Sequence, residues 1–267
     1  MSKITTEEFR ICKECSESYQ HVPDYWPDEQ AGEDLNAELY HCPSCESITE
    51  ERWEKERRQQ EKEDAAKAAE QAAKAAWIKA VPPLYRDTDT THPDYPQAVH
   101  RKAIQWQKTR ETGEGNGRLF LGMIGDSGRC KTRVISQVMK RIIWNGHCCQ
   151  WVNATEFQRL VQSQWSNEKK ASKSIFKSST TVGEEARASL ERLRTCDALT
   201  LDDLGKGRIT DTVAGALYDL LEERTAQGRT TLWTSNASLD NLLQMLPSDC
   251  GGPIVRRLLD FSTIIKL

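Results

Sequence analysis

The chain has 267 residues, of which 37% are hydrophobic and 29% are charged, and its formal net charge is −3. These values are typical of a globular chain of one or two domains. No apolar run approaches the ~20 residues that span a bilayer. The first residues lack the basic and apolar regions of a signal peptide. We therefore expect a cytoplasmic protein without membrane contact, in which any nucleic-acid contact comes from a local basic patch.

Two Cys-x-x-Cys pairs lie in the first segment, residues 1–48. Cys12 and Cys15 form one pair, and Cys42 and Cys45 form the other. Two such pairs predict a tetrahedral structural zinc (Zn²⁺) site, and reduced thiols or a redox pair are the alternatives. Acidic residues outnumber basic ones in this segment, and four thiolates leave a zinc site negative. We therefore expect the zinc-binding module to bind a protein rather than DNA.

The second segment, residues 49–80, is rich in Glu, Lys, Arg, Gln and Ala and has neither glycine nor proline. This composition predicts one long solvated helix. A sustained apolar seam is missing, which argues against a coiled coil and favours a helical linker between domains. Pro82 and Pro83 follow it and should end it. We therefore place a third domain at residues 81–267.

Strand-like and helix-like stretches alternate through residues 81–267. Strands are expected at 119–124, 148–152, 198–203, 230–234 and 262–267, and helices at 132–144, 156–164, 184–194, 212–224 and 239–245. This alternation predicts an α/β fold with a parallel sheet covered by helices on both faces.

Residues 125–132 read Gly-Asp-Ser-Gly-Arg-Cys-Lys-Thr, between an expected strand and an expected helix. They match the phosphate-binding pattern G-x-x-x-x-G-K-[ST], except that Cys130 replaces the second glycine. In such a loop, backbone N–H groups and the helix amino terminus hold the phosphates. Lys131 should reach the β- and γ-phosphates of ATP, and the Thr132 hydroxyl should hold Mg²⁺. A glycine-rich turn without a ligand is the alternative.

Three further elements follow in the order that an ATPase needs. Asp202 and Asp203 end an apolar strand, where the first should hold Mg²⁺ and the second should act as general base. Asn236 follows the next strand and should face the γ-phosphate, although a turn or helix cap has the same local pattern. Arg257 is a candidate to reach a neighbouring subunit's phosphate, or an exposed basic helix end.

These assignments give two sets of residues. The expected nucleotide-binding set is Gly125, Asp126, Ser127, Gly128, Arg129, Cys130, Lys131, Thr132, Arg133 and Asp202. The expected catalytic set is Lys131, Asp203, Asn236 and Arg257.

In this order, the elements resemble the AAA+ ATPases of the DnaC and DnaI helicase-loader family and their relative IstB. The segment at 81–87 is similar to the stretch before the family's core, 125–132 to its Walker A loop and 201–206 to its Walker B strand. Residues 234–236 resemble sensor 1, and Arg257 resembles the arginine finger. The resemblance covers 81–267 and implies the AAA+ P-loop fold, ATP hydrolysis at a subunit junction and a homo-oligomer. It also implies single-stranded DNA in the oligomer interior and a zinc module that contacts the replicative helicase.

Three functions stay open on the sequence. The first is an ATP-dependent loader of the replicative DNA helicase. The second is an IstB-like transposition helper, against which the acidic zinc module argues because such a helper needs affinity for duplex DNA. The third is a nucleotide-binding zinc adaptor in which Cys130 has removed most turnover. The polar stretch at 165–180, with its lysines and aromatic residues, is a candidate contact for single-stranded DNA or a solvated loop.

Overall fold

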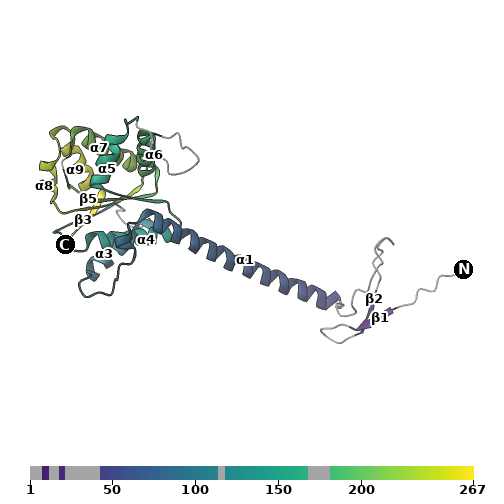
Figure 1. Ribbon diagram of the computed structural model, residues 1–267. Helices are drawn as coiled ribbons and strands as arrows, with labels where there is room; N and C mark the ends of the chain where they lie inside the picture. The colour runs from purple at the N-terminus through teal and green to yellow at the C-terminus, as the bar shows by residue number, and fades with distance from the viewer. Residues whose placement is uncertain (1–7, 12–17, 22–42, 114–117, 168–180, 208) are drawn as a thin grey trace. The chain divides into compact units, whose positions relative to one another are not determined.

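The structure is a computed structural model that describes residues 8–11, 18–21, 43–113, 118–167, 181–207 and 209–267 (Figure 1). The chain divides into two compact units, Met1–Ala68 and Ala69–Leu267. Within the described residues, no helix has the length and apolar character needed to cross a membrane.

The first unit contains a short antiparallel pair of strands, β1 (Glu8–Ile11) and β2 (Ser18–His21). Three of the four cysteines of the expected zinc site, Cys12, Cys15 and Cys42, lie outside the described residues, as does the side chain of Cys45. Among the side chains that are described, no three His, Cys, Asp or Glu residues gather into a metal site. The zinc site therefore stays a prediction.

The long helix expected at 49–80 is present as α1 (Pro43–Ala80), which begins earlier than expected and ends before Pro82. Ion pairs one turn apart, such as Arg58 to Glu54 at 3.0 Å, line its exposed part. Its last turns differ, because Trp77 is buried and its ring meets the edge of the Trp144 ring with 6.2 Å between centroids. This end of α1 therefore belongs to the second unit, which begins at Ala69.

The second unit is built on a five-stranded parallel sheet with the order β4-β5-β6-β3-β7. Its strands are β3 (Phe120–Ile124), β4 (Cys149–Asn153), β5 (Ala198–Leu204), β6 (Thr230–Ser235) and β7 (Ser262–Lys266). All five expected strands are present, and the expected α/β fold class is confirmed.

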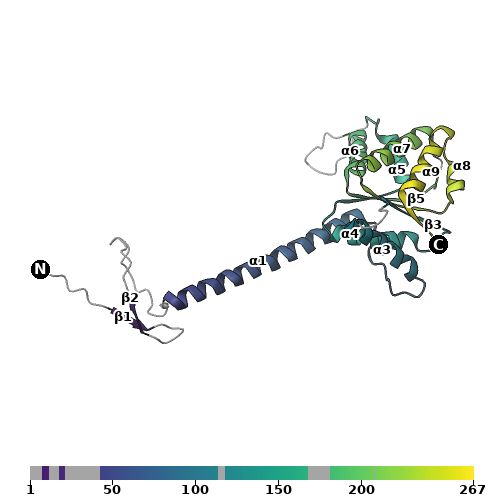
Figure 2. The same cartoon turned by 180° about the vertical axis from the view of Figure 1, so that it is seen from behind.

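Helices cover both faces of this sheet. They are α2 (Pro83–Arg86), α3 (Gln97–Thr112), α4 (Lys131–Trp144), α5 (Ala154–Ser163), α6 (Val182–Thr195), α7 (Asp211–Ala226), α8 (Leu239–Met245) and α9 (Ser248–Phe261). Figures 1 and 2 show α3 and α4 on one side of the sheet and α5 to α9 on the other. The sequence predicted neither α3 nor α9. Helix α3 was missed because polar residues dominate it. Helix α9 was missed because it contains Pro253, and proline is disfavoured in helix interiors.

The side chains of the central strand β3 alternate between the two faces. Phe120 and Ile124 pack into the core under α5 to α9, whereas Leu121 and Met123 pack into the core under α3 and α4. Because both faces are covered, every residue of β3 is buried. This is why its sequence is a continuous apolar run rather than an alternating one.

The face of β3 has room for a tryptophan only because Gly122 lacks a side chain. Trp233, the register partner of Gly122 on β6, is fully buried and donates its indole N–H to the Ser262 hydroxyl on β7 at 2.8 Å. A Cβ on Gly122 would lie 2.3 Å from the Trp233 ring. The ring thus crosses β3 at Gly122 and joins β6 to β7.

We predict that Gly122→Ala lowers the free energy of unfolding by about 1–3 kcal/mol or more, because the buried Trp233 ring cannot move aside. Chemical denaturation measures this change. Gly215→Ala is the matched control: it lies inside α7 with no atom near the new Cβ, and it should stabilise the protein by up to ~1 kcal/mol. Equal effects of the two substitutions would contradict the proposed clash.

Candidate nucleotide site

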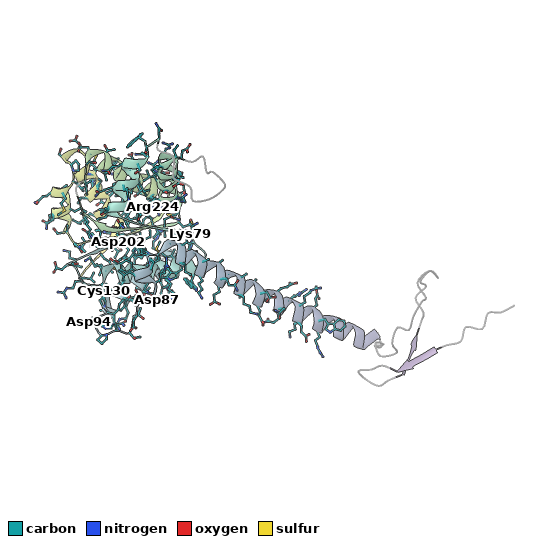
Figure 3. The ribbon with its side chains drawn as sticks, viewed as in Figure 1. Lys79, Asp87, Asp94, Cys130, Asp202 and Arg224 are labelled. Carbon is teal, nitrogen blue, oxygen red and sulfur yellow. The ribbon has the colours of Figure 1, made fainter. Side chains whose placement is uncertain are left out.

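The candidate site lies at the carboxyl ends of β3, β5 and β6. Because the strands are parallel neighbours, this edge gathers the loop after β3, the acids at the end of β5 and Asn236 just after β6. The loop runs from Gly125 to Cys130, and α4 begins at Lys131. Figure 3 marks Cys130 and Asp202 in the second unit. The expected order of strand, loop and helix is therefore present.

Lys131 is almost fully buried, and its ammonium donates three hydrogen bonds. The acceptors are the Gly125 carbonyl, the Asp126 carbonyl and Asn236 Oδ1, each at 2.7 Å. Burial lowers the pKa of Lys131, while Asp203, Asp126 and Asp202 oppose that shift. The lysine thus joins the loop to the end of β6, and phosphate oxygens of a nucleotide would replace some of these acceptors.

Asp202 is buried, and one of its oxygens, Oδ1, accepts two hydrogen bonds from hydroxyl groups. Thr132 on α4 donates at 3.0 Å, and Thr234 on β6 donates at 2.6 Å. Burial raises the pKa of the Asp202 carboxyl, and the hydrogen bond from Thr234 opposes this shift. The Thr132 hydroxyl and the Asp202 carboxylate are therefore within 3.0 Å of each other, which fits a Mg²⁺ site made of hard oxygen ligands.

Asp203 has a backbone conformation that is uncommon for a residue with a side chain, with φ of 59°. Its N–H donates to the Thr234 hydroxyl at 2.9 Å, and its carboxylate pairs with Lys206 at 3.2 Å. The left-handed conformation of Asp203 interrupts the extended backbone of β5, directly after Asp202. Sequence reasoning missed both Thr234 and Lys206 as partners of the two acids, although both stand in the matched motifs.

Cys130 also has a left-handed conformation, with φ of 58° and ψ of 18°. It occupies the N-cap position of α4, and its side chain makes no capping hydrogen bond. Glycine adopts this conformation without a steric penalty, whereas a side chain costs on the order of 1–2 kcal/mol. The phosphate-binding pattern therefore has glycine at this position because the backbone is left-handed there. Cys130 adopts the same conformation at a cost in free energy.

Tyr85 on α2 is an additional residue of the site. Its ring stacks on Trp151 with 5.8 Å between centroids, and its backbone carbonyl accepts a hydrogen bond from the Ser136 hydroxyl on α4 at 3.3 Å. Burial raises the pKa of the Tyr85 phenol, and the charges of Asp202 and Asp203 raise it further. In the sequence Tyr85 is part of the segment at 81–87, and no local pattern there predicts that it packs on α4.

The other expected residues separate into two groups. Asp126, Ser127, Gly128 and Arg129 are exposed on the loop, and Arg133 is partly buried in the first turn of α4. Arg257 on α9 lies elsewhere: it forms an ion pair with Glu222, and its guanidinium stacks over the Tyr218 ring at 4.5 Å. The structure thus does not bring Arg257 to the nucleotide site of its own chain.

The candidate DNA-binding stretch at 165–180 is described only in part. Trp165 is exposed, and residues 168–180, which hold its lysines, lie outside the described residues. A DNA contact there stays a prediction.

No protein-family model matches the chain, and no curated protein does. The chain is similar in structure to DnaI, with 18% identity, a TM-score of 0.50, and coverage of 67% of this chain and 88% of that one. It is also similar to a candidate primosome component from Streptococcus pyogenes serotype M3, with 18% identity, a TM-score of 0.51, and coverage of 72% and 95%. At this identity the likeness is one of fold. The chain therefore shares the fold of these two proteins, in agreement with the α/β fold that the resemblance to the helicase loaders implied.

Proposed function

We propose that the chain is an ATPase whose site is the carboxyl edge of β3, β5 and β6. The observation that carries this proposal is the contact of Thr132 and Asp202 next to the buried Lys131. In a site of this kind, the loop N–H groups and Lys131 bind the phosphates of ATP. Thr132 and Asp202 would hold Mg²⁺, which when bound neutralises charge on the phosphates.

The remaining groups fit hydrolysis. Asp203 would take a proton from the attacking water as general base. In the structure its carboxylate pairs with the exposed Lys206, so this acid must leave that pair to reach the water. Asn236, which accepts a hydrogen bond from Lys131, would face the γ-phosphate. Arg257 would act on the site of a neighbouring subunit, for which its ion pair with Glu222 must open.

For the biological role, we propose an ATP-dependent loader of the replicative DNA helicase. The fold shared with DnaI and with a candidate primosome component supports this role. The paired cysteines of the first segment support a zinc module that contacts the helicase, on their spacing alone. A homo-oligomer with single-stranded DNA in its interior completes the proposal.

Two alternatives have specific support. The strained backbone at Cys130 favours a nucleotide-binding zinc adaptor with little turnover. An IstB-like transposition helper has the same expected motifs, and the acidic first segment argues against it.

We expect Lys131→Ala to abolish ATP binding, because it removes the cation that meets the β- and γ-phosphates. Asp203→Asn should keep ATP binding, because asparagine tolerates the left-handed backbone, but should slow hydrolysis about 10²–10⁴-fold through loss of the base. Equilibrium binding of a fluorescent ATP analogue and phosphate release measure the two effects. Unchanged nucleotide affinity in Lys131→Ala would overturn the site assignment.

Cys130→Gly should raise both stability and ATP turnover. Glycine removes a strain on the order of 1–2 kcal/mol, offset in part by its larger entropy in the unfolded chain, which costs roughly 0.5–1 kcal/mol. Cys130→Ala is the matched control, because it removes the thiol and keeps the Cβ. If alanine gives the same gain as glycine, the thiol and not the backbone limits the loop. A Cys130→Gly variant that binds ATP and still does not hydrolyse it would favour the adaptor.

The role as a loader predicts that the chain binds the replicative helicase of the same source and places it on single-stranded DNA when ATP is present. Unwinding of a strand annealed to a protein-coated DNA circle measures loading, and Lys131→Ala should fail in this assay. Stimulation of a transposase on duplex DNA without any binding to the helicase would instead favour the transposition helper.

A further inference from the structure

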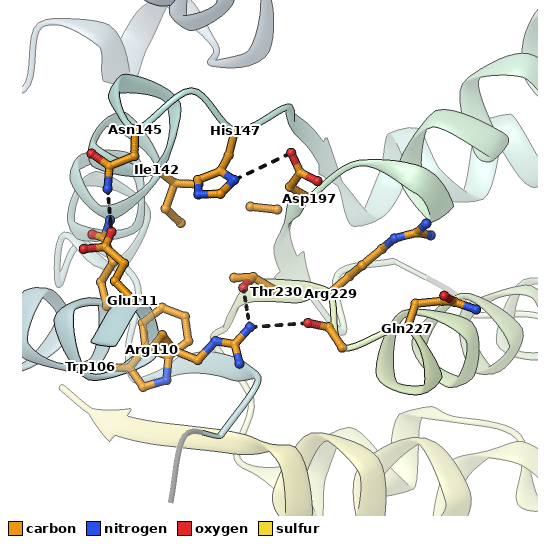
Figure 4. Close-up of a pocket in the computed structure, with 13 residues that line it drawn as sticks. Trp106, Arg110, Glu111, Ile142, Asn145, His147, Asp197, Gln227, Arg229 and Thr230 are labelled. Atoms are coloured by element: carbon orange, nitrogen blue, oxygen red, sulfur yellow. Dashed lines mark hydrogen bonds and ion pairs between the residues drawn. The ribbon is translucent and has the colours of Figure 1, made fainter. Parts of the chain in front are cut away.

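A second cavity opens at the opposite edge of the sheet, where β5 and β6 begin. It has a volume of about 690 Å³ and is lined by residues at the ends of α3, α4 and α7 and at the starts of β5 and β6 (Figure 4). The nucleotide site lies where the same two strands end. The cavity is therefore separate from the ATPase chemistry, and its size suits a small organic ligand.

Arg110 on α3 is the first unusual group in the cavity wall. Its guanidinium is partly buried, and burial lowers its pKa without an opposing carboxylate. Its hydrogen bonds go to the Gly228 carbonyl and the Thr230 hydroxyl, both at 3.3 Å, and no ion pair among the described residues includes it. A partly buried charge without a counter-charge is costly, so Arg110 is suited to bind an anionic group.

Two carboxylates line the same cavity, and neither has a lysine or arginine partner among the described residues. Asp197 accepts a hydrogen bond from the Cys148 N–H at 2.8 Å and lies 3.8 Å from His147. Glu111 accepts hydrogen bonds from Gln107 at 2.9 Å and Asn145 at 2.7 Å. Figure 4 shows the pair of Asp197 and His147 across the cavity from Arg110.

These opposite charges cannot neutralise one another within the chain. Arg110 and Glu111 are consecutive in α3, and consecutive helical residues point in different directions. Arg229, the other guanidinium of the wall, extends away from Arg110 and donates to the Arg194 carbonyl at 2.6 Å. Gln107 is buried, and its Oε1 has no hydrogen-bond donor among the described residues. The wall thus offers separated positive and negative groups whose bonding capacity the fold uses only in part.

We propose that this cavity binds a small zwitterion of the α-amino-acid type. The carboxylate of the ligand pairs with Arg110, and its ammonium faces Asp197 and Glu111. A lone anion such as phosphate is attracted by Arg110 but repelled by the two carboxylates. A lone cation is attracted by the carboxylates but repelled by Arg110. The buried side chains of Trp106, Ile142 and Ala198 form the apolar part of the wall, which suits a ligand with a hydrocarbon side chain.

The test uses the full chain with Lys131→Ala, so that anions cannot act through the nucleotide loop. The common L-amino acids at millimolar concentration are screened by thermal shift and then by calorimetry, beside the deaminated acid and the decarboxylated amine of each hit. At least one amino acid should stabilise the protein, and neither of its two analogues should do so. No stabilisation by any amino acid, or stabilisation by inorganic phosphate alone, overturns the proposal.

Arg110→Gln and Asp197→Asn should each weaken the identified amino acid about tenfold or more, as expected for loss of a charge-assisted hydrogen bond. Arg101→Gln, an exposed arginine on the same helix, is the matched control and should leave the affinity unchanged. Arg110→Gln without ligand should be about as stable as the parent, because the loss of two long hydrogen bonds is offset by removal of a partly buried charge that has no ion pair. If Arg110→Gln fails to fold, Asp197→Asn tests the proposal alone. The asparagine Oδ1 can still accept the hydrogen bond from the Cys148 N–H, so this variant should fold. Unchanged affinity for the amino acid in this variant contradicts the proposal.

Discussion

The candidate nucleotide site depends on a buried carboxylate oxygen, Oδ1 of Asp202, that is shared by two hydroxyl groups. Thr132 donates from α4 and Thr234 from β6, so three separate elements meet at one atom. A buried carboxylate without such donors would be costly. The Thr234 hydroxyl also accepts the N–H of Asp203. The same threonine therefore sets the position of both acids relative to the loop.

Two residues with side chains have positive φ among the described residues, Cys130 and Asp203, and both lie in this site. Each such residue costs on the order of 1–3 kcal/mol, which the surrounding structure must supply. The two cases differ in their chemistry. Aspartate is among the residues that tolerate this conformation, and in it the Asp203 N–H donates to Thr234 while the carboxylate pairs with Lys206. Cysteine has no such tolerance, so the fixed ends of the loop at Gly125 and α4 impose the conformation on it.

The sequence predicted the parts of the site that are local patterns and missed those that depend on tertiary contacts. A buried parallel strand is a continuous apolar run, so β3 and the loop after it were visible without the structure. The position of Tyr85 beside Thr132 was not, because it depends on how α2 packs on α4. The same holds for Arg257, whose partners Glu222 and Tyr218 come from another helix. Residues in α3 were missed because few apolar side chains mark its buried face.

The amino edge of the sheet shows how differently this fold treats its buried cations. Arg224 is fully buried, and it donates to the carbonyls of Leu193 and Cys196 at 2.8 and 2.9 Å and to the Thr231 hydroxyl at 3.0 Å. Its donors are thus consumed in holding the end of α6 against β5 and β6, which is a structural role. Arg110 at the same edge makes two long hydrogen bonds and faces a cavity. Arg110 thus joins α3 to the start of β6 through only two long hydrogen bonds, and the rest of its donor capacity is available to a ligand.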